Sequence, residues 1–204
     1  MLTHELKTPI SVAKLSLDAM ATEGVDHDRI QRALENMNDV VERCRISDAL
    51  DGHRFEVRRE SFDLRETVFE HIDLLQNPNR VKVFEGNNVF IYSDSQLVRI
   101  IVANLLDNAL KYSPDQSDIN VQISHQIQDG RAGASLLVTN LIGPAGIPDA
   151  DKVFQKYYRA KKAEGKSGSG LGLYLTAGIA DLLGGQVSYR AGESRIEFDL
   201  WLPD

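Results

Sequence analysis

The segment His4-Glu5-Leu6-Lys7-Thr8-Pro9 places an imidazole beside a carboxylate in a stretch whose apolar spacing is helical. An imidazole with an ordinary pKa of about 6.5 is largely neutral at pH 7 and offers a nucleophilic lone pair. Glu5 can orient the ring or accept its proton, and Thr8, one turn later, lies on the same helix face as His4. An isolated His-Glu pair on a helix is by default a solvated surface pair, so this segment gains meaning from the rest of the chain.

A second group of polar residues lies in residues 95–112, where the apolar spacing also predicts a helix. Five residues follow each other at steps of four, three, four and three and therefore share one helix face: Leu97, Ile101, Asn104, Asn108 and Lys111. The amide oxygens of Asn104 and Asn108 can face a hydrated Mg²⁺, and Lys111 can meet a phosphate oxygen. The alternative is that both asparagines bond to neighbouring backbone, and these residues alone leave both interpretations open.

A glycine-rich stretch, Gly168-Ser169-Gly170-Leu171-Gly172, comes at the start of a third predicted helix, residues 170–183. Exposed amides at a helix N-terminus, helped by the helix dipole, can cradle a phosphate. Taken alone, a flexible turn is the better interpretation, and the dinucleotide-binding fingerprint fits poorly. Cations cluster just before the glycines in a chain whose net charge is -7, which suits a polyphosphate; they are Lys152, Lys156, Arg159, Lys161, Lys162 and Lys166.

Two amphipathic helices must carry the first segment. Residues 2–22 show one apolar stripe, interrupted and bent by Pro9, and a second stripe follows a turn at Gly24. Asp26 or Asp28 is the expected cap of the second helix, whose stripe consists of Ile30, Ala33, Met37, Val40, Cys44 and Ser47. Because a single helical hairpin leaves part of its apolar seam without a partner, we expect two copies to form a dimeric four-helix bundle.

The apolar period changes after residues 51–55, which read as a linker. Strands rich in β-branched and aromatic residues are predicted at 55–64, 81–84, 88–92, 119–127, 135–141, 186–189 and 195–202. Helices are predicted at 65–76, 95–112 and 170–183. Strands in runs, without strict alternation with helices, predict an α+β sandwich with its helices on one face.

Composition narrows the function classes. A chain of 204 residues with 42% apolar residues is globular, and its net charge of -7 argues against nucleic-acid binding. A single cysteine, Cys44, rules out an internal disulfide and a cysteine-cluster metal site. No apolar run reaches the roughly 18 residues of a membrane span, so we expect these residues to be soluble and to make no membrane contact.

Four segments in order resemble the conserved boxes of bacterial sensor histidine kinases. Residues 4–9 resemble the H box, 104–112 the N box, 154–159 (Phe-Gln-Lys-Tyr-Tyr-Arg) the F box and 168–172 the G2 box. The resemblance covers nearly the whole chain. It implies a dimerisation and phosphoacceptor hairpin at residues 1–50, a linker at 51–55 and a Bergerat-type ATP-binding domain, an α/β sandwich, at 56–204.

The resemblance also implies a role for individual residues. His4 would accept the γ-phosphoryl group of ATP and pass it to an aspartate of a response regulator, with Glu5 assisting and Thr8 placing water for a phosphatase activity. Asn108 would hold Mg²⁺ with Asn104 nearby, Lys111 and Tyr112 would touch the phosphates, and Arg159 would reach the γ-phosphate. The remaining nucleotide contacts would come from Asn140, Gly146, Gly168, Gly170, Leu171 and Gly172. Implied partners are a second copy and a receiver domain, and the parent protein would be anchored in the inner membrane with this part in the cytoplasm.

Two features depart from the family pattern. The G1 box commonly reads Asp-x-Gly-x-Gly, whereas residues 140–148 read Asn-Leu-Ile-Gly-Pro-Ala-Gly-Ile-Pro. Asn140 can accept a hydrogen bond from the adenine amino group, but exchanging a charged acceptor for a neutral one loses about 1 kcal/mol, so we expect weak ATP binding. Only three residues precede His4, where the family has a signalling helix, so we expect a catalytic part of a longer protein.

Two other interpretations remain open at this stage. The altered G1 segment could make the chain a docking module that binds a regulator without using nucleotide. The chain could also be a relative of the chaperone and topoisomerase ATPases, which share the Bergerat pocket, but such proteins have no reason to carry the His4 segment.

Overall fold

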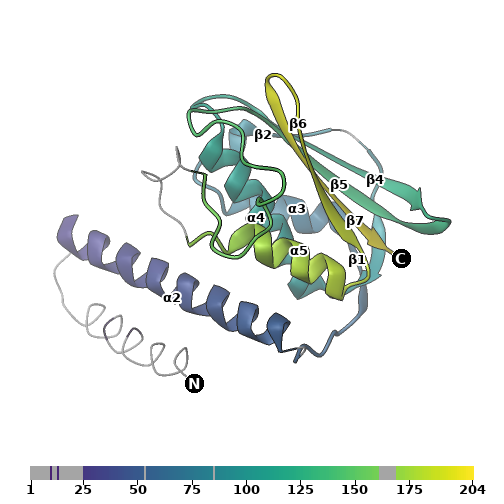
Figure 1. The fold of residues 1–204 in the computed structure, drawn as a ribbon, viewed down its shortest axis with the longest axis horizontal. Coiled ribbons are helices and arrows are strands. Elements are labelled where there is room, and N and C mark those ends of the chain that lie inside the picture. Colours follow the sequence, from purple (N-terminus) through teal and green to yellow (C-terminus); the bar gives the residue numbers. More distant parts are fainter. Residues whose placement is uncertain (1–9, 11–12, 14–24, 53, 85, 161–168) are drawn as a thin grey trace. The chain divides into compact units, whose positions relative to one another are not determined.

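The chain forms two compact units, residues 1–55 and residues 56–204, in the computed structural model. The structure describes residues 10, 13, 25–52, 54–84, 86–160 and 169–204 (Figure 1). The His4–Pro9 segment, most of the first predicted helix and Gly168 lie outside the described residues.

The described part of the first unit is one long helix, α2 (Val25–Asp51). It begins before Asp26 and Asp28, so neither residue caps it as predicted; both lie inside its first turn or two. The apolar side chains of this helix differ in exposure. Leu34, Val41 and Ile46 are buried, whereas Ile30, Met37 and Val40 of the predicted stripe are 50%, 56% and 45% exposed.

The second unit is built on a mixed five-stranded sheet. Its strand order is β2-β4-β5-β7-β6, in which β2 runs parallel to β4 and every other pair is antiparallel (Figure 1). The strands are β2 (Val81–Val83), β4 (Ile119–Gln128), β5 (Arg131–Leu141), β6 (Gln186–Ala191) and β7 (Arg195–Pro203). A separate antiparallel ribbon pairs β1 (Glu60–Asp63) with β3 (Phe90–Ser93).

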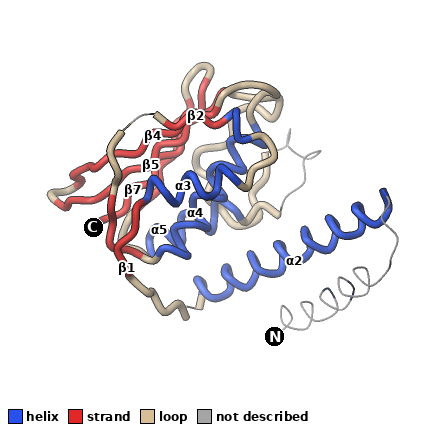
Figure 2. Tube along the Cα trace, turned by 180° about the vertical axis from the view of Figure 1, so that it is seen from behind, coloured by secondary structure: helices blue, strands red, loops and turns tan. Residues whose placement is uncertain are grey.

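Three helices cover one face of this sheet, as Figures 1 and 2 show. They are α3 (Leu64–Asp73), α4 (Ser95–Tyr112) and α5 (Gly172–Leu182), and a short 3₁₀ helix, η1 (Pro78–Arg80), precedes β2. The predicted α+β sandwich with its helices on one face is confirmed. No helix in the described part of the chain has the length and apolarity of a membrane span.

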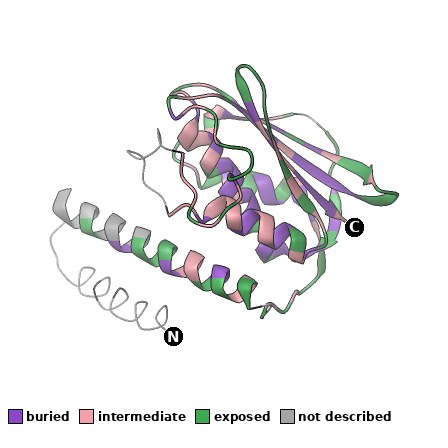
Figure 3. Cartoon of the chain, in the orientation of Figure 1, coloured by how far each residue is buried: buried purple, intermediate pink, exposed green. Residues whose placement is uncertain are grey.

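The core lies between the sheet and the helices because side chains alternate across the strands. Val121, Val138 and Phe198 are register partners on β4, β5 and β7, and all three are buried. Figure 3 shows buried residues both on the sheet and on the helices that cover it. From the helices, Leu105 and Ile179 are fully buried. Each such side chain contributes about 1.5–3 kcal/mol relative to an exposed one, which fixes α4 and α5 on the sheet.

Aspartates set the starts of α3 and α4. The Asp63 carboxylate accepts hydrogen bonds from the amides of Arg65 (2.9 Å) and Val89 (3.1 Å). The Asp94 carboxylate accepts from the amides of Gln96 and Leu97, both at 3.1 Å, and from that of Arg58 at 2.8 Å. Both helices therefore begin with their first amides satisfied.

Candidate functional site

The polar face of α4 is partly buried. Asn104 is 3% exposed, and its Nδ2 atom has no hydrogen-bond partner among the described residues. Asn108, Lys111 and Tyr112 are half-buried on the following turns, and Lys111 Nζ lies 4.9 Å from the centroid of the Tyr112 ring. A buried amide that lacks a partner costs about 1–3 kcal/mol, which is a cost that a bound ligand or water can remove.

The helix α5 packs against α4. The helix begins at Gly172 after the fully buried Leu171, and among the described residues it has no side-chain cap and no acid in its first turn. This differs from α3 and α4, which are capped by Asp63 and Asp94. The Leu171 amide before the helix donates to Ser169 Oγ at 3.4 Å. The amides of the first turn have no side-chain cap, and together with the positive end of the helix dipole they suit an anion.

The loop after β5 rests on the C-terminal end of α4. A Cβ atom on Gly143 would lie 2.1 Å from the carbonyl oxygen of Tyr112, so only glycine permits this approach. The loop then closes a turn in which the Gly146 amide donates to the Gly143 carbonyl at 2.9 Å, and Gly146 takes a φ of +74°. Both glycines are therefore required by the backbone path itself.

The segment Phe154–Arg159 contacts the glycines before α5 through the backbone. The Tyr157 amide donates to the Gly170 carbonyl at 3.1 Å, and the two residues have φ values of +65° and +72°. Lys156 Nζ lies 5.5 Å from the centroid of the Tyr174 ring on α5. Arg159 is half-buried at the end of this segment. The structure thus brings residues 154–159 and 170–174 together.

Two tyrosines hold the loop that connects these parts. The Tyr158 hydroxyl accepts a hydrogen bond from the Asp149 amide at 2.9 Å, and the Tyr189 hydroxyl donates to the Pro148 carbonyl at 3.1 Å. The Tyr189 ring packs on Phe198, at 5.3 Å between centroids, and burial raises the pKa of the Tyr189 hydroxyl. Sequence reasoning missed both tyrosines as loop supports, because side-chain bonds to distant backbone leave no local pattern.

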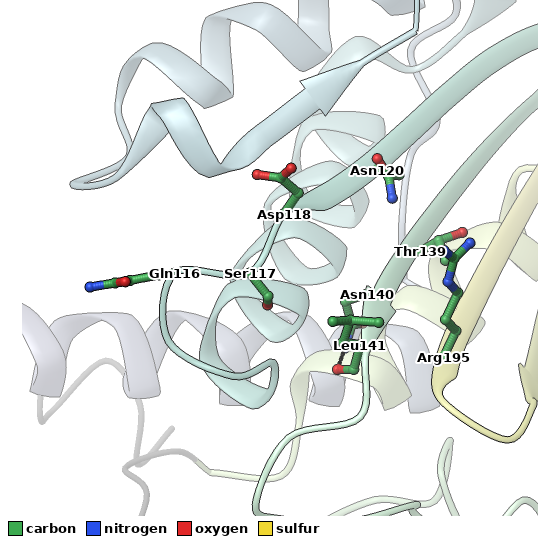
Figure 4. A pocket seen from close by; sticks show the side chains of 8 residues that line it. All are labelled: Gln116, Ser117, Asp118, Asn120, Thr139, Asn140, Leu141 and Arg195. Carbon is green, nitrogen blue, oxygen red and sulfur yellow. Dashed lines mark hydrogen bonds between the residues drawn. The ribbon is translucent and has the colours of Figure 1, made fainter.

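Asn140 lies near the end of β5, between Ile119 of β4 and Ile196 of β7. It is 3% exposed and belongs to the buried, helix-facing row of the sheet. Its Nδ2 atom donates to the carbonyl of Leu141 at 2.8 Å, which fixes one end of the carboxamide (Figure 4). The amide oxygen is the end that can accept a hydrogen bond.

Comparison with known proteins identifies the architecture. Residues 93–204 match the sequence profile of the family described as histidine kinase-, DNA gyrase B-, and HSP90-like ATPases. The chain belongs to this family. The matched residues contain α4, the loop after β5, the segment 154–159 and the glycines before α5.

Individual relatives of this ATPase-family chain include sensor kinases. The chain is 28% identical over 209 residues to the adaptive-response sensory kinase SasA of Gloeothece citriformis, covering 92% of this chain and 52% of SasA. It thus spans about half the length of the curated relatives it matches. Two solved structures share the fold at lower identity. The Acinetobacter baumannii histidine kinase AdeS gives a TM-score of 0.66 at 21% identity, covering 98% of this chain and 97% of AdeS. Full-length ShkA in complex with AMPPNP gives a TM-score of 0.71 at 20% sequence identity, covering 99% of this chain and 44% of ShkA.

One hollow of this histidine kinase-like ATPase lies apart from the arrangement just described. It has a volume of about 390 Å³ and lies at the start of β4 and the end of β5 (Figure 4). Its lining residues are Gln116, Ser117, Asp118, Asn120, Thr139, Asn140, Leu141 and Arg195. Asn120 pairs with Thr139, and Leu141 with Arg195, in rows that alternate with the buried Asn140 row. The strand residues that line the hollow therefore belong mostly to the rows that point away from the helices, and Asn140, from the helix-facing row, is the only predicted site residue among those that line it.

Part of the predicted site is not among the described residues. His4, Glu5, Thr8 and Gly168 lie outside the described residues, so their predicted roles stay predictions. Within the described part of the chain, no group of three or more His, Cys, Asp and Glu side chains could hold a metal ion.

Proposed function

We propose that this chain is the catalytic portion of an ATP-dependent protein histidine kinase in a two-component system. In this proposal His4 takes the γ-phosphoryl group of ATP and passes it to an aspartate of a response regulator, with Glu5 assisting and Thr8 supporting phosphatase activity toward that regulator. The observation that carries the proposal is the uncapped N-terminus of α5, packed against the helix that bears the unpartnered Asn104 amide. The family match supports ATP as the nucleotide.

Each part of the nucleotide would meet a different element. The amides at Gly170, Leu171 and Gly172 and the cation of Lys111 would hold the phosphates, together with Tyr112 and Gly168. Arg159 would reach the γ-phosphate, and Asn140 and Gly146 would contact the base side. These roles suit phosphoryl transfer, because catalysis of this reaction consists mainly of positioning the phosphates and neutralising their charge.

Asn108 would ligate Mg²⁺, with Asn104 beside it one turn earlier on α4. The residues fit this ion because they offer neutral oxygen ligands on a half-buried face next to a cation-lined phosphate site. When bound, Mg²⁺ supplies charge neutralisation between the β- and γ-phosphates.

We expect the affinity for ATP to be low. An aspartate that accepts from the adenine amino group makes a charge-assisted hydrogen bond, whereas Asn140 makes a neutral one that is weaker by about 1 kcal/mol. The bond from Asn140 Nδ2 to Leu141 fixes the carboxamide, so the remaining acceptor oxygen keeps one orientation. Titration calorimetry with a non-hydrolysable ATP analogue tests this, and tight binding typical of an intact acidic site would contradict it.

The proposed partners are a second copy of this chain and a receiver domain. The exposed side chains of Ile30, Met37 and Val40 on α2 support a second copy, because an apolar row of this kind on a long helix is the usual seam of a helical bundle. Light scattering after size exclusion would show a dimer, and a monomer at high concentration would refute this part. We further propose that the parent protein is membrane-anchored, with these residues in the cytoplasm.

Incubation with γ-labelled ATP and Mg²⁺ tests the activity. Wild-type protein should acquire an acid-labile, base-stable label, and both His4→Gln and Asn108→Ala should lose it. The two variants separate the acceptor from the nucleotide site, since His4→Gln should still bind the ATP analogue and Asn108→Ala should not bind it with Mg²⁺. Nucleotide binding without any label on His4 would refute the kinase, and absence of binding would favour the docking module.

A further inference from the structure

Arg80 lies at the end of η1, outside the region that matches the ATPase family profile, yet it is bonded to the loop that follows α4. Its Nε donates to the Ser117 carbonyl at 2.9 Å. Its Nη2 donates to Ser113 Oγ at 2.7 Å and to the Pro114 carbonyl at 3.0 Å. One half-buried guanidinium thus joins three residues of the loop 113–117 in a fork that only arginine can form.

Ser113 links this fork to the last turn of α4. It is the C-cap residue of the helix and is 1% exposed, and its amide donates to the Ala109 carbonyl at 3.1 Å. Its hydroxyl accepts from Arg80 while it donates to the Leu110 carbonyl at 3.4 Å. The positive charge of Arg80 also sits at the C-terminal end of an 18-residue helix, where the helix dipole favours a cation.

The same end of α4 is held from another direction by the loop after β5. The Gly143 backbone lies so close that a Cβ atom there would be 2.1 Å from the Tyr112 carbonyl oxygen and 2.9 Å from the Ser113 carbonyl carbon. Residues 112 and 113 are therefore fixed between the Arg80 fork and the Gly143 backbone. Lys111 and Tyr112, the residues assigned to the phosphates, belong to this fixed turn.

We propose that Arg80 is a positioning residue of the nucleotide site, which sets the last turn of α4 so that Lys111 and Tyr112 meet the phosphates. The inference rests on the proposed function, because it assumes that a nucleotide binds beside α4. Arg80 itself touches no phosphate in this proposal. Its effect passes through Ser113, so it should act on the phosphate part of the ligand and leave the binding of the nucleoside part unchanged.

The test compares two ligands on the whole chain: a non-hydrolysable ATP analogue with Mg²⁺, measured by calorimetry, and adenosine, measured by NMR titration. Because Arg80→Ala loses the fork, it should lower the affinity for the ATP analogue about tenfold, equal to about 1.4 kcal/mol. Its affinity for adenosine should stay within twofold of the wild-type value. Arg80→Lys keeps the charge without the fork, so its affinity for the ATP analogue should lie between those of wild type and Arg80→Ala. Ser113→Ala removes only the link to the helix and should also lower the affinity for the ATP analogue.

Ile123→Val on β4 is the matched control, because it lowers stability in the same unit without touching the loop 113–117. It should bind both ligands as wild type does. Failure of wild-type protein to bind the analogue would refute the proposed function. Wild-type binding together with an Arg80→Ala variant of unchanged affinity would overturn the inference alone. Equal weakening of analogue and adenosine would also overturn it, because it would assign Arg80 a general structural role.

Discussion

Replacement of Gly170 by alanine tests the backbone contact between the segment 154–159 and the glycines before α5. Gly170 has a φ of +72°, and a Cβ atom there would lie 2.8 Å from the Tyr157 carbonyl carbon and 2.9 Å from the Tyr158 carbonyl oxygen. Both neighbours are backbone atoms. Tyr157 is itself held at a φ of +65°, so it has little freedom to move away.

Two costs add in this variant. The left-handed conformation costs an alanine about 1–2 kcal/mol. The forced contact with backbone costs about a further 1–3 kcal/mol. The lower entropy of the unfolded alanine chain returns about 0.4–1 kcal/mol. Gly170→Ala should thus lower the free energy of unfolding by about 1–5 kcal/mol, or displace the glycines and lose nucleotide binding instead.

Gly130→Ala is the matched control, since Gly130 has a φ of +76° but no atom within 4 Å of its added Cβ. It should lose about 1 kcal/mol or less, because only the conformational cost remains. Urea unfolding followed by fluorescence gives both values, and the single tryptophan, Trp201, is buried in the unit 56–204 and reports on that unit. If both variants lose the same stability and both bind the ATP analogue like wild type, the contact has no role and the reasoning is wrong.

Three further variants probe the caps, the buried amide and the buried tyrosine. Asn104→Leu should raise stability by about 1 kcal/mol, because it removes the unpartnered Nδ2 atom, and should abolish binding of the ATP analogue in calorimetry. Asp94→Ala should cost about 2 kcal/mol in urea unfolding, because three backbone amides lose their acceptor, and a change below 0.5 kcal/mol would contradict the cap. Because burial raises the pKa of Tyr189 above its unfolded value of 10.0, its contribution to stability is complete below pH 10 and lost as pH rises through the folded pKa. In alkaline denaturation, the free energy of unfolding of Tyr189→Phe should therefore fall less steeply above pH 10 than that of wild type. Identical dependence on pH in the two proteins would refute this.

Local signals predicted the helix α4 and the β4–β5 pair well. The predicted bounds of α4, 95–112, are confirmed because Asp94 caps its start and Pro114 follows its end. The strand β4 ends one residue beyond the predicted segment and β5 begins four residues before it, so both strands reach the turn at Asp129 and Gly130, which both have positive φ. The Asp-Gly pair in a two-residue hairpin turn was the available signal.

Long-range pairing could not be predicted in the same way. The segment 55–64 was predicted as a strand throughout, but only Glu60–Asp63 has a partner, on β3, so the strand is shorter. The apolar spacing of α2 identified a helix but did not tell which of its side chains are covered within the chain. Ile30, Met37 and Val40 of the predicted stripe are exposed, whereas Ser47 of the same stripe is buried.

For the candidate site, the sequence pointed to α4 and the glycines, and the structure places these helices against each other. It could not point to Arg80, Tyr158 or Tyr189. Each of these residues acts through a bond to backbone that is distant in sequence, and no motif surrounds it. The alternation of residues 186–189 predicted a strand, but not the bond of Tyr189 to Pro148.

The two edge strands of the sheet limit how this chain can aggregate. At one end β2 has three residues, and at the other β6 carries the exposed Arg190, which pairs with Glu197 at 3.3 Å. A short border strand and a charged one offer a poor template for a strand from another molecule. The ATPase unit should therefore stay dispersed at high concentration and resist growth into fibrils, even where apolar side chains on α2 draw two copies together.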